Sequence, residues 1–216
     1  MPSVYNLKPK FQNLLRPLVG KLASWGVTAN MVTLAAMLGS IAYGFWLGYL
    51  LSCRADSARD ALILLPLFLF CRMALNAVDG MLAREHGQKS LLGAYLNEVG
   101  DVVSDFALYL PFMLLMPRFS MAWVTFIGLC LLTELVGVMG LTIGANRRYD
   151  GPFGKSDRAT LFGILGICGW HMLRQPEGAA SMATILLWVC LTGSALSFLT
   201  LFNRVANALK EVRHAD

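Results

Sequence analysis

The chain has 216 residues, of which 56% are hydrophobic and 14% charged, with a mean hydropathy of +0.59 and a formal net charge of +5. A soluble domain is normally about a quarter charged. These values therefore exclude an ordinary soluble enzyme, a disordered protein and a nucleic-acid-binding module. They indicate an all-α polytopic membrane protein. Because each span takes about 20 residues, six spans leave only short loops, and we expect a single domain over residues 1–216.

The first 26 residues are expected to form an amphipathic helix lying in the membrane interface. Apolar and polar residues occupy opposite helical faces, which is typical of interfacial helices. The apolar face comprises Leu7, Phe11, Leu14, Leu15, Leu18, Leu22 and Trp25. A helix packed on a soluble core is the alternative, and the composition disfavours it because no soluble core is available.

Six apolar runs follow within residues 27–205 and predict a six-helix transmembrane bundle. They cover Thr28–Leu51, Ala58–Leu82, Leu91–Met116, Ala122–Ile143, Ala159–Leu173 and Ala180–Phe202. Residues 206–216 are expected to form a tail. Pro111 lies within the third run and should bend it, since proline removes a helical hydrogen bond.

The distribution of basic residues predicts the orientation of the bundle. Under a six-span topology both termini share one side, and the opposite side holds only Arg54, Arg59, Arg118 and Arg174. Every other Lys and Arg lies on the side of the termini, except Arg72 within the second run. The positive-inside rule places both termini in the cytoplasm. The basic residues thus indicate topology, and no nucleic-acid partner is expected.

Polar side chains gather at the second and third runs. Placing polar side chains within a membrane span costs free energy, so these residues are candidates for function. The second run ends with Arg72, Asn76, Asp79, Gly80 and Arg84, and the third begins with Gly93, Asn97, Glu98, Asp101 and Asp105. Spacings of three and four residues place each polar set on one helical face. A short loop joins the two runs, so their polar faces are expected to meet near the cytoplasmic surface.

These residue types suit a phosphate-binding metal site. Carboxylate and amide oxygens are the ligands that Mg²⁺ or Mn²⁺ prefers. Gly80 and Gly93 permit close approach to the backbone, and Arg84 can neutralise a phosphate. The alternative is that the acids merely pair with Arg72 and Arg84 to join two helices.

The pattern Asn76-x2-Asp79-Gly80-x2-Ala83-Arg84-x8-Gly93-x3-Asn97-x3-Asp101 resembles the signature of the CDP-alcohol phosphatidyltransferase family, which has Asp at all four acidic places. Val27–Thr33 is similar to the family's entry into its first span, with Ala29 where a Pro is usual. The resemblance implies an interfacial helix and six spans in a bacterial inner membrane, with a cytoplasmic active site and a homodimeric state. The implied reaction belongs to phospholipid biosynthesis: a phosphatidyl group moves from a CDP-diacylglycerol-like lipid to a small alcohol, releasing CMP.

The resemblance also assigns roles to residues. Metal ligands would be Asn76, Asp79, Asn97 and Asp101, CDP would contact Asp79, Gly80, Ala83, Arg84 and Gly93, and Asp101 would be the general base. Asn76 and Asn97 depart from the family pattern, because a neutral amide replaces a carboxylate at each. We therefore expect one tightly held Mg²⁺ or Mn²⁺, or a second ion that arrives only with the diphosphate.

Two further groups are candidates. Arg72 and Asp105 should lie at similar depth and could form a supporting ion pair, with Glu134 as a rival partner for Arg72. The cations Arg147, Arg148, Lys155 and Arg158 lie in or beside a Gly-containing cytoplasmic loop and could hold an acceptor's phosphate, which would favour a phosphorylated or acidic acceptor. The alternative for this loop is positive-inside charge in contact with membrane lipid headgroups.

Two other functions remain as alternatives. A catalytically impaired family member could bind CDP-lipid or nucleotide without turnover, and the two Asn replacements motivate this hypothesis. A transporter with an intramembrane cation site is disfavoured, because the acids lie at one end of the spans instead of at the membrane midplane.

Overall fold

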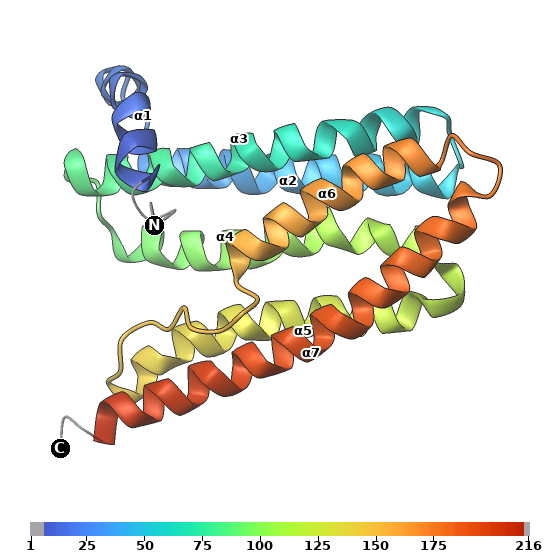
Figure 1. The fold of residues 1–216 in the computed structure, drawn as a ribbon. Coiled ribbons are helices and arrows are strands. Elements are labelled where there is room, and N and C mark those ends of the chain that lie inside the picture. The colour runs from blue at the N-terminus through green and yellow to red at the C-terminus, as the bar shows by residue number, and fades with distance from the viewer. Residues whose placement is uncertain (1–6, 214–216) are drawn as a thin grey trace. The chain divides into compact units, whose positions relative to one another are not determined.

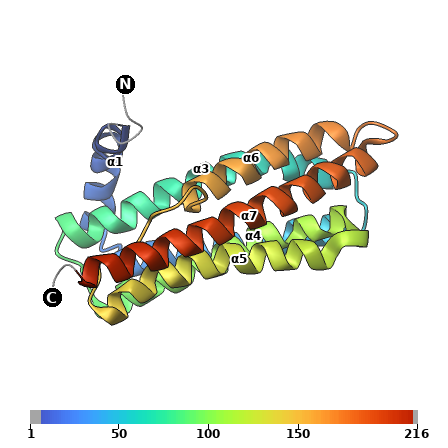
Figure 2. The same cartoon turned by 60° about the horizontal axis from the view of Figure 1, so that its bottom comes forward.

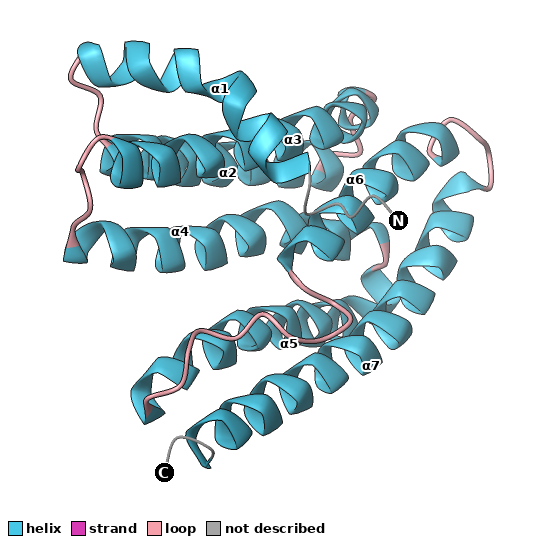
Figure 3. Cartoon of the chain, turned by 60° about the vertical axis from the view of Figure 1, so that its left-hand side comes forward, coloured by secondary structure: helices cyan, strands magenta, loops and turns pink. Residues whose placement is uncertain are grey.

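The structure is a computed structural model that describes residues 7–213. Within that range the chain is helical, with no β-strand (Figures 1 and 3). The α-helices are α1 (Leu7–Ser24), α2 (Ala29–Ser52), α3 (Ser57–Glu85), α4 (Leu91–Tyr109), α5 (Ser120–Met139), α6 (Lys155–Met172) and α7 (Gly178–Arg213). Short 3-10 helices are η2 (Leu110–Leu115), η3 (Pro117–Phe119) and η4 (Gly140–Ile143). The predicted all-α class is confirmed.

Four helical stretches are long and apolar enough to cross a membrane. They are α2, α3, the stretch Pro117–Ile143 that contains α5, and α7. The third and fifth predicted spans correspond to α4 and α6, of 19 and 18 residues, and each of these helices carries charged side chains. The charges are Glu98, Asp101 and Asp105 in α4, and Lys155, Asp157 and Arg158 in α6. A multi-pass membrane protein is therefore supported, and the full count of six spans stays a prediction.

The N-terminal helix α1 packs against the start of α2 and the end of α3. Val19 of α1 is fully buried in a cluster with Val32 of α2 and Met81 of α3. Leu14 and Leu18, which the periodicity placed on the same face, are exposed instead. An interfacial location for α1 stays a prediction, and these exposed leucines are the side chains that would enter the membrane.

The chain forms two compact units. The first comprises Met1–Tyr43 and Leu67–Ser104, and the second comprises Gly44–Pro66 and Asp105–Asp216. Helices α2, α3 and α4 contribute residues to both. All of the sequence-predicted CDP-site and metal-site residues fall in the first unit.

Aromatic side chains form the core of the second unit, in which α5 and α7 run side by side (Figure 2). Trp123 of α5 is fully buried and its indole N–H donates to the Tyr109 carbonyl oxygen over 2.9 Å. The Tyr109 ring stacks on Phe162 of α6 with 3.6 Å between ring centroids. This core fixes α5 and α6, and with them the loop at residues 144–154 that precedes α6.

Pro111 changes the third predicted span. Helix α4 ends at Tyr109 and continues as the 3-10 helix η2, because Pro111 has no N–H to donate to the Ala107 carbonyl. Gly44 of α2 approaches that same carbonyl so closely that a Cβ on residue 44 would collide with it. Gly44 therefore serves packing between α2 and α4.

The predicted tail is largely helical. Helix α7 extends without interruption to Arg213, so residues 206–213 continue the last helix. Residues 214–216 lie outside the described part of the chain.

Candidate active site

Two consecutive helices carry the sequence-predicted site. The last turns of α3 hold Asn76, Asp79, Gly80 and Arg84, and the first turns of α4 hold Gly93, Asn97 and Asp101. The connection between them is short and includes Gly87 at φ 68°, a left-handed conformation that glycine adopts at little cost. This turn reverses the chain and brings the two polar faces together.

A hydrogen bond joins the two faces directly. The Asn76 side-chain amide donates to Asp101 Oδ1 over 2.9 Å. Arg72, which is buried, donates to the same oxygen over 3.3 Å and to the Asp101 backbone carbonyl over 3.2 Å. These contacts confirm that the predicted faces meet, and they fix the orientation of the Asp101 carboxylate.

Helix α2 adds a third side to the site. The Thr33 hydroxyl donates to Asp79 Oδ2 over 2.9 Å, and Asp79 is only 5% exposed. Gln88, from the connection between α3 and α4, accepts a hydrogen bond from the Ala29 backbone N–H over 2.7 Å. The start of α2 is thus tied to the same turn that positions the acidic residues.

A pocket of about 700 Å³ lies among these three helices within the first unit. Its lining includes seven of the predicted residues: Asn76, Asp79, Gly80, Ala83, Arg84, Gly93 and Asn97. Asp101 adjoins the pocket through its hydrogen bond with Asn76. Arg84 and Lys89 are exposed and add positive charge to the lining. The pocket therefore combines basic side chains, carboxylate and amide oxygens and small residues, which suits a ligand with a diphosphate.

Gly93 makes close contacts at the pocket wall. A Cβ at this position would lie 2.7 Å from Asn30 Oδ1 and 2.9 Å from Ser90 Oγ, so one of these side chains would have to shift. The Gly93 N–H donates to Ser90 Oγ over 2.9 Å. Gly80 makes room for Arg84, since a Cβ there would lie 3.0 Å from the guanidinium nitrogens.

Several lining residues were not assigned a role by the sequence: Asn30, Thr33, Gln88, Lys89 and Ser90. Asn30 and Thr33 lie within the Val27–Thr33 segment that resembles the family, so that resemblance could have identified them. Gln88 acts through bonds to the distant residues Val27 and Ala29, and no local pattern predicts such contacts.

The residue types at the site are ones that could hold a hard divalent cation. Asp79 and Asp101 carry two carboxylates, and Asn76 and Asn97 carry neutral carbonyl oxygens, so the four side chains together would balance the charge of a single Mg²⁺ or Mn²⁺. Among the described residues, no group of three or more His, Cys, Asp and Glu side chains is arranged to hold a metal. The two Asn replacements account for this, since they leave only two carboxylates.

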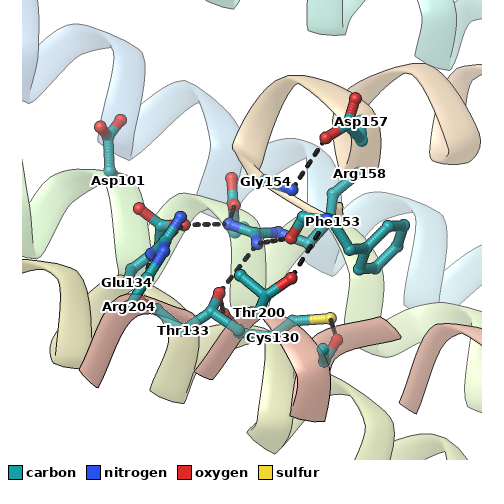
Figure 4. A network of polar contacts seen from close by, with 12 residues as sticks. Asp101, Cys130, Thr133, Glu134, Phe153, Gly154, Asp157, Arg158, Thr200 and Arg204 are labelled. Atoms are coloured by element: carbon teal, nitrogen blue, oxygen red, sulfur yellow. Dashed lines mark hydrogen bonds and ion pairs between the residues drawn. The ribbon is translucent and has the colours of Figure 1, made fainter. Parts of the chain in front are cut away.

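The basic residues of the loop before α6 have partners within the second unit. Arg158 is 1% exposed and donates to Glu134 Oε1 over 2.8 Å and to Thr133 Oγ1 over 3.0 Å, as Figure 4 shows. Arg148 donates to Asp150 and to Glu211, each over 2.7 Å. Arg147 lies 3.8 Å from Glu134 Oε2. Lys155 is the first residue of α6 and is partly buried.

Arg72 and Asp105, the two predicted supporting residues, each form an ion pair within their own unit. Arg72 contacts Asp101 in the first unit, and Asp105 lies 3.6 Å from Arg158 in the second. Because Arg72 and Asp105 belong to different units, the predicted pair between them stays a prediction. Glu134, the rival partner considered for Arg72, instead has Arg158 and Arg204 as partners in its own unit.

Comparison with known proteins identifies relatives of this chain. The family model for CDP-alcohol phosphatidyltransferase matches residues 26–196. Inner membrane protein YnbA of Escherichia coli (strain K12) is 50% identical over 167 residues, covering 76% of this chain and 79% of that protein. Phosphatidylinositol phosphate synthase of Streptomyces avermitilis is 28% identical over 221 residues, covering 95% and 82%. The chain belongs to the CDP-alcohol phosphatidyltransferase family.

Solved structures show the same fold. The crystal structure of Mycobacterium tuberculosis phosphatidylinositol phosphate synthase (PgsA1) in complex with manganese and citrate has a TM-score of 0.68 at 17% identity, covering 89% of this chain and 88% of that one. The structure of the same enzyme with CDP-DAG bound has a TM-score of 0.65 at 18% identity, covering 89% and 92%. The chain therefore shares the fold of these structures.

Proposed function

We propose that this protein transfers a phosphatidyl group from CDP-diacylglycerol to the hydroxyl of an alcohol and releases CMP. The observation that carries the proposal is the pocket between α2, α3 and α4, where the Asn76–Asp101 hydrogen bond joins the two halves of the family signature. Family membership and the CDP-DAG that is bound in the PgsA1 structure support the choice of donor.

The donor would occupy the pocket with its diphosphate near Arg84 and Lys89, the exposed cations of its lining. Gly80 and Gly93 line the pocket, and Gly80 leaves room at its wall for the Arg84 guanidinium. Arg84 would neutralise phosphate charge by charge-assisted hydrogen bonds. These contacts would hold the donor so that its phosphorus faces the acceptor.

Asp101 would act as the general base. It would accept the proton of the acceptor hydroxyl while the oxygen forms a bond to phosphorus and the bond to the CMP oxygen breaks. Asn76 and Arg72 hold the carboxylate for this step, so we place them as positioning residues. A divalent cation, when bound by Asp79, Asp101, Asn76 and Asn97, supplies positive charge next to the diphosphate and the departing phosphate.

The orientation in the membrane and the oligomeric state are proposals as well. The asymmetry of basic residues supports cytoplasmic termini and a site at the cytoplasmic face of a bacterial inner membrane, as does the name of the E. coli relative. A homodimer is proposed from the family resemblance alone, because the Gly44 contact is explained within one chain.

The test is a turnover assay on the purified protein. CDP-diacylglycerol, Mg²⁺ or Mn²⁺ and a panel of alcohols are supplied, and CMP release and lipid product are followed. Release that depends on both the metal and an acceptor is expected. Tight binding of CDP-diacylglycerol without CMP release from any acceptor would favour a family member that binds its ligand without turnover.

A further inference from the structure

Gln88 lies in the connection between α3 and α4 and contacts the start of α2, all within the first unit. Its Oε1 accepts a hydrogen bond from the Ala29 backbone N–H over 2.7 Å, and its side-chain amide donates to the Val27 carbonyl over 3.4 Å. Gln88 is partly buried, whereas Gly87 and Lys89 on either side of it are exposed. A single side chain thus joins the connection to residues 59 and 61 positions earlier in the chain.

The Ala29 N–H is one of the backbone donors that α2 cannot satisfy by itself, because the first four N–H groups of a helix have no partner within it. Thr28 satisfies another of them: its Oγ1 accepts from the Met31 N–H over 3.2 Å, as an N-cap residue does. Gln88 supplies the partner for Ala29 from a distant segment. Loss of the Gln88 bond would therefore leave the Thr28 cap of α2 in place.

Apolar packing holds the start of α2 independently of Gln88. Ala29 is 6% exposed and belongs to the buried cluster that includes Met81 of α3. The residues that flank Gln88 in the connection, from His86 to Ser90, are exposed instead. A segment with few buried apolar contacts opens at a low free-energy cost. The two bonds of Gln88 therefore restrain the connection, and the packing of α2 on α3 does not depend on them.

Lys89, a cation in the lining of the donor pocket, stands between two restrained neighbours. Gln88 is bound to the start of α2, and Ser90 Oγ accepts from the Gly93 N–H over 2.9 Å at the start of α4. We infer that Gln88 is a positioning residue that holds Lys89 at the donor pocket. The inference rests on the proposed function, in which the donor diphosphate lies near Lys89. A lysine that is restrained before binding loses less conformational freedom when it binds an anion.

The first experiment measures the affinity of the purified protein for CDP-diacylglycerol in the absence of an acceptor. Gln88→Leu removes both hydrogen bonds and keeps a side chain of similar size, so we expect binding about tenfold weaker than in the wild type. Lys89→Gln should also weaken binding, and adding Gln88→Leu to it should change the affinity by less than about twofold, because the two residues act together. Gln175→Leu, the same chemical change at an exposed position, should bind like the wild type. Losses that multiply in the double variant would overturn the inference.

Ala29→Pro tests the hydrogen bond from its other side. Proline has no backbone N–H and is tolerated in the first turn of a helix, so the change removes the donor of the 2.7 Å bond and still allows α2 to begin. We expect the same loss of affinity as in Gln88→Leu, and no further loss when the two changes are combined. Wild-type affinity in Ala29→Pro, with weak binding in Gln88→Leu, would mean that Gln88 contacts the donor itself and would overturn the positioning role. If Gln88→Leu does not fold, Ala29→Pro combined with Lys89→Gln provides the same comparison.

Turnover separates positioning from a general structural effect. In Gln88→Leu the KM for CDP-diacylglycerol should rise about tenfold, while kcat stays within about twofold of the wild-type value, because Asp101 keeps its contacts with Asn76 and Arg72. A partly unfolded variant would instead show a lower kcat at an unchanged KM, and that result would contradict the inference.

A measurement without donor distinguishes a failure of this inference from a failure of the proposed function. The Ala29 amide hydrogen, followed by NMR, should exchange with solvent at least about tenfold faster in Gln88→Leu than in the wild type. The Met31 amide, which Thr28 still caps, should exchange at the wild-type rate. Unchanged exchange at Ala29 would overturn the inference, whatever reaction the protein catalyses. If the wild type does not bind CDP-diacylglycerol, the proposed function fails, and the exchange rate alone decides whether Gln88 holds the connection to α2.

Discussion

The amide of Asn76 donates to the Asp101 carboxylate over 2.9 Å, across the interface between α3 and α4. In the family signature both positions are acidic, and two carboxylates at this distance would repel each other unless a cation lay between them. The amide in this chain replaces that repulsion with a hydrogen bond. The site is therefore held together without relying on a metal ion.

Asn76→Asp tests this relationship. The substitution removes an N–H donor and places two like charges together, so we expect the metal-free protein to lose roughly 1–3 kcal/mol of unfolding free energy. Affinity for Mn²⁺ should rise because a third carboxylate joins the ligand set. Asn97→Asp is the comparison, since it adds the same charge and keeps the Asn76–Asp101 bond. Equal metal-free stability of Asn76→Asp and the wild type would contradict the account.

Metal stoichiometry follows from the same two amides. The wild-type protein without nucleotide should bind one Mn²⁺ tightly, because two carboxylates balance one divalent ion. Equilibrium dialysis with metal analysis measures this number. Two tightly bound ions per chain in the absence of CDP-lipid would show that two Asn residues do not limit the site as proposed.

Gly93→Ala tests the wall of the pocket. The new methyl group would lie 2.7 Å from Asn30 Oδ1, so Asn30 or the start of α4 must move, at a cost of roughly 1–3 kcal/mol. Binding of CDP-diacylglycerol should weaken with it. Gly20→Ala is the control, because a Cβ at Gly20 meets nothing within 4 Å; it should leave binding unchanged. If Gly93→Ala binds CDP-diacylglycerol with the affinity of the wild type, the assignment of this pocket as the donor site is contradicted.

Arg158→Met tests the buried cluster of ion pairs that Arg158 forms with Glu134 and Asp105. The change leaves Glu134 and Asp105 with less compensation in a buried setting, and we expect a loss of roughly 3–5 kcal/mol in unfolding free energy. Arg59→Met is the matched control, because the Arg59–Asp56 pair is exposed and such pairs contribute about 0–1 kcal/mol. Thermal unfolding in detergent measures both. Equal losses in the two variants would mean that the cluster does not stabilise the fold.

The Arg148–Asp150 pair predicts a pH dependence. The Arg148 guanidinium, which donates to Asp150, holds the pKa of the Asp150 carboxyl below its ordinary value. A lowered folded-state pKa stabilises the folded protein above the unfolded pKa of about 3.9, and this contribution is lost as pH falls through the folded pKa. Unfolding temperatures between pH 6 and pH 3 should therefore fall less steeply in Asp150→Asn than in the wild type. The exposed Asp60→Asn variant should follow the wild type.

Sequence periodicity and spacing were sufficient to predict that the polar faces of α3 and α4 meet. Fixed intervals in α3 and α4 determine which side chains share a face, so the meeting of Asn76 with Asp101 followed from local geometry. The same reasoning could not find Gln88 or Asn30, because their roles depend on contacts with residues far along the chain. Pro111 was noticed, but its effect was to convert the end of a span into a 3-10 helix instead of only bending it.

Whether a charged side chain is already paired within the chain was harder to predict than which side chains share a helical face. The loop before α6 is rich in arginine, and sequence alone does not reveal that Glu134 and Glu211, distant along the chain, neutralise these arginines. Likewise, α4 and α6 read as apolar runs, yet their acids and bases exclude them from the four helices that meet the length and composition of a span. In the first case tertiary pairing decides whether an arginine is available to a ligand, and in the second the number of charged residues decides whether a helix has the composition of a span.

The most direct test of the central claim is CMP release by Asp101→Asn. The substitution keeps the size of the side chain and removes the base, so we expect the rate to fall roughly 100-fold or more while CDP-diacylglycerol still binds. Asp60→Asn, the same chemical change at an exposed position, should retain the wild-type rate. A rate for Asp101→Asn equal to that of the wild type would contradict the assignment of Asp101 and, with it, the proposed active site.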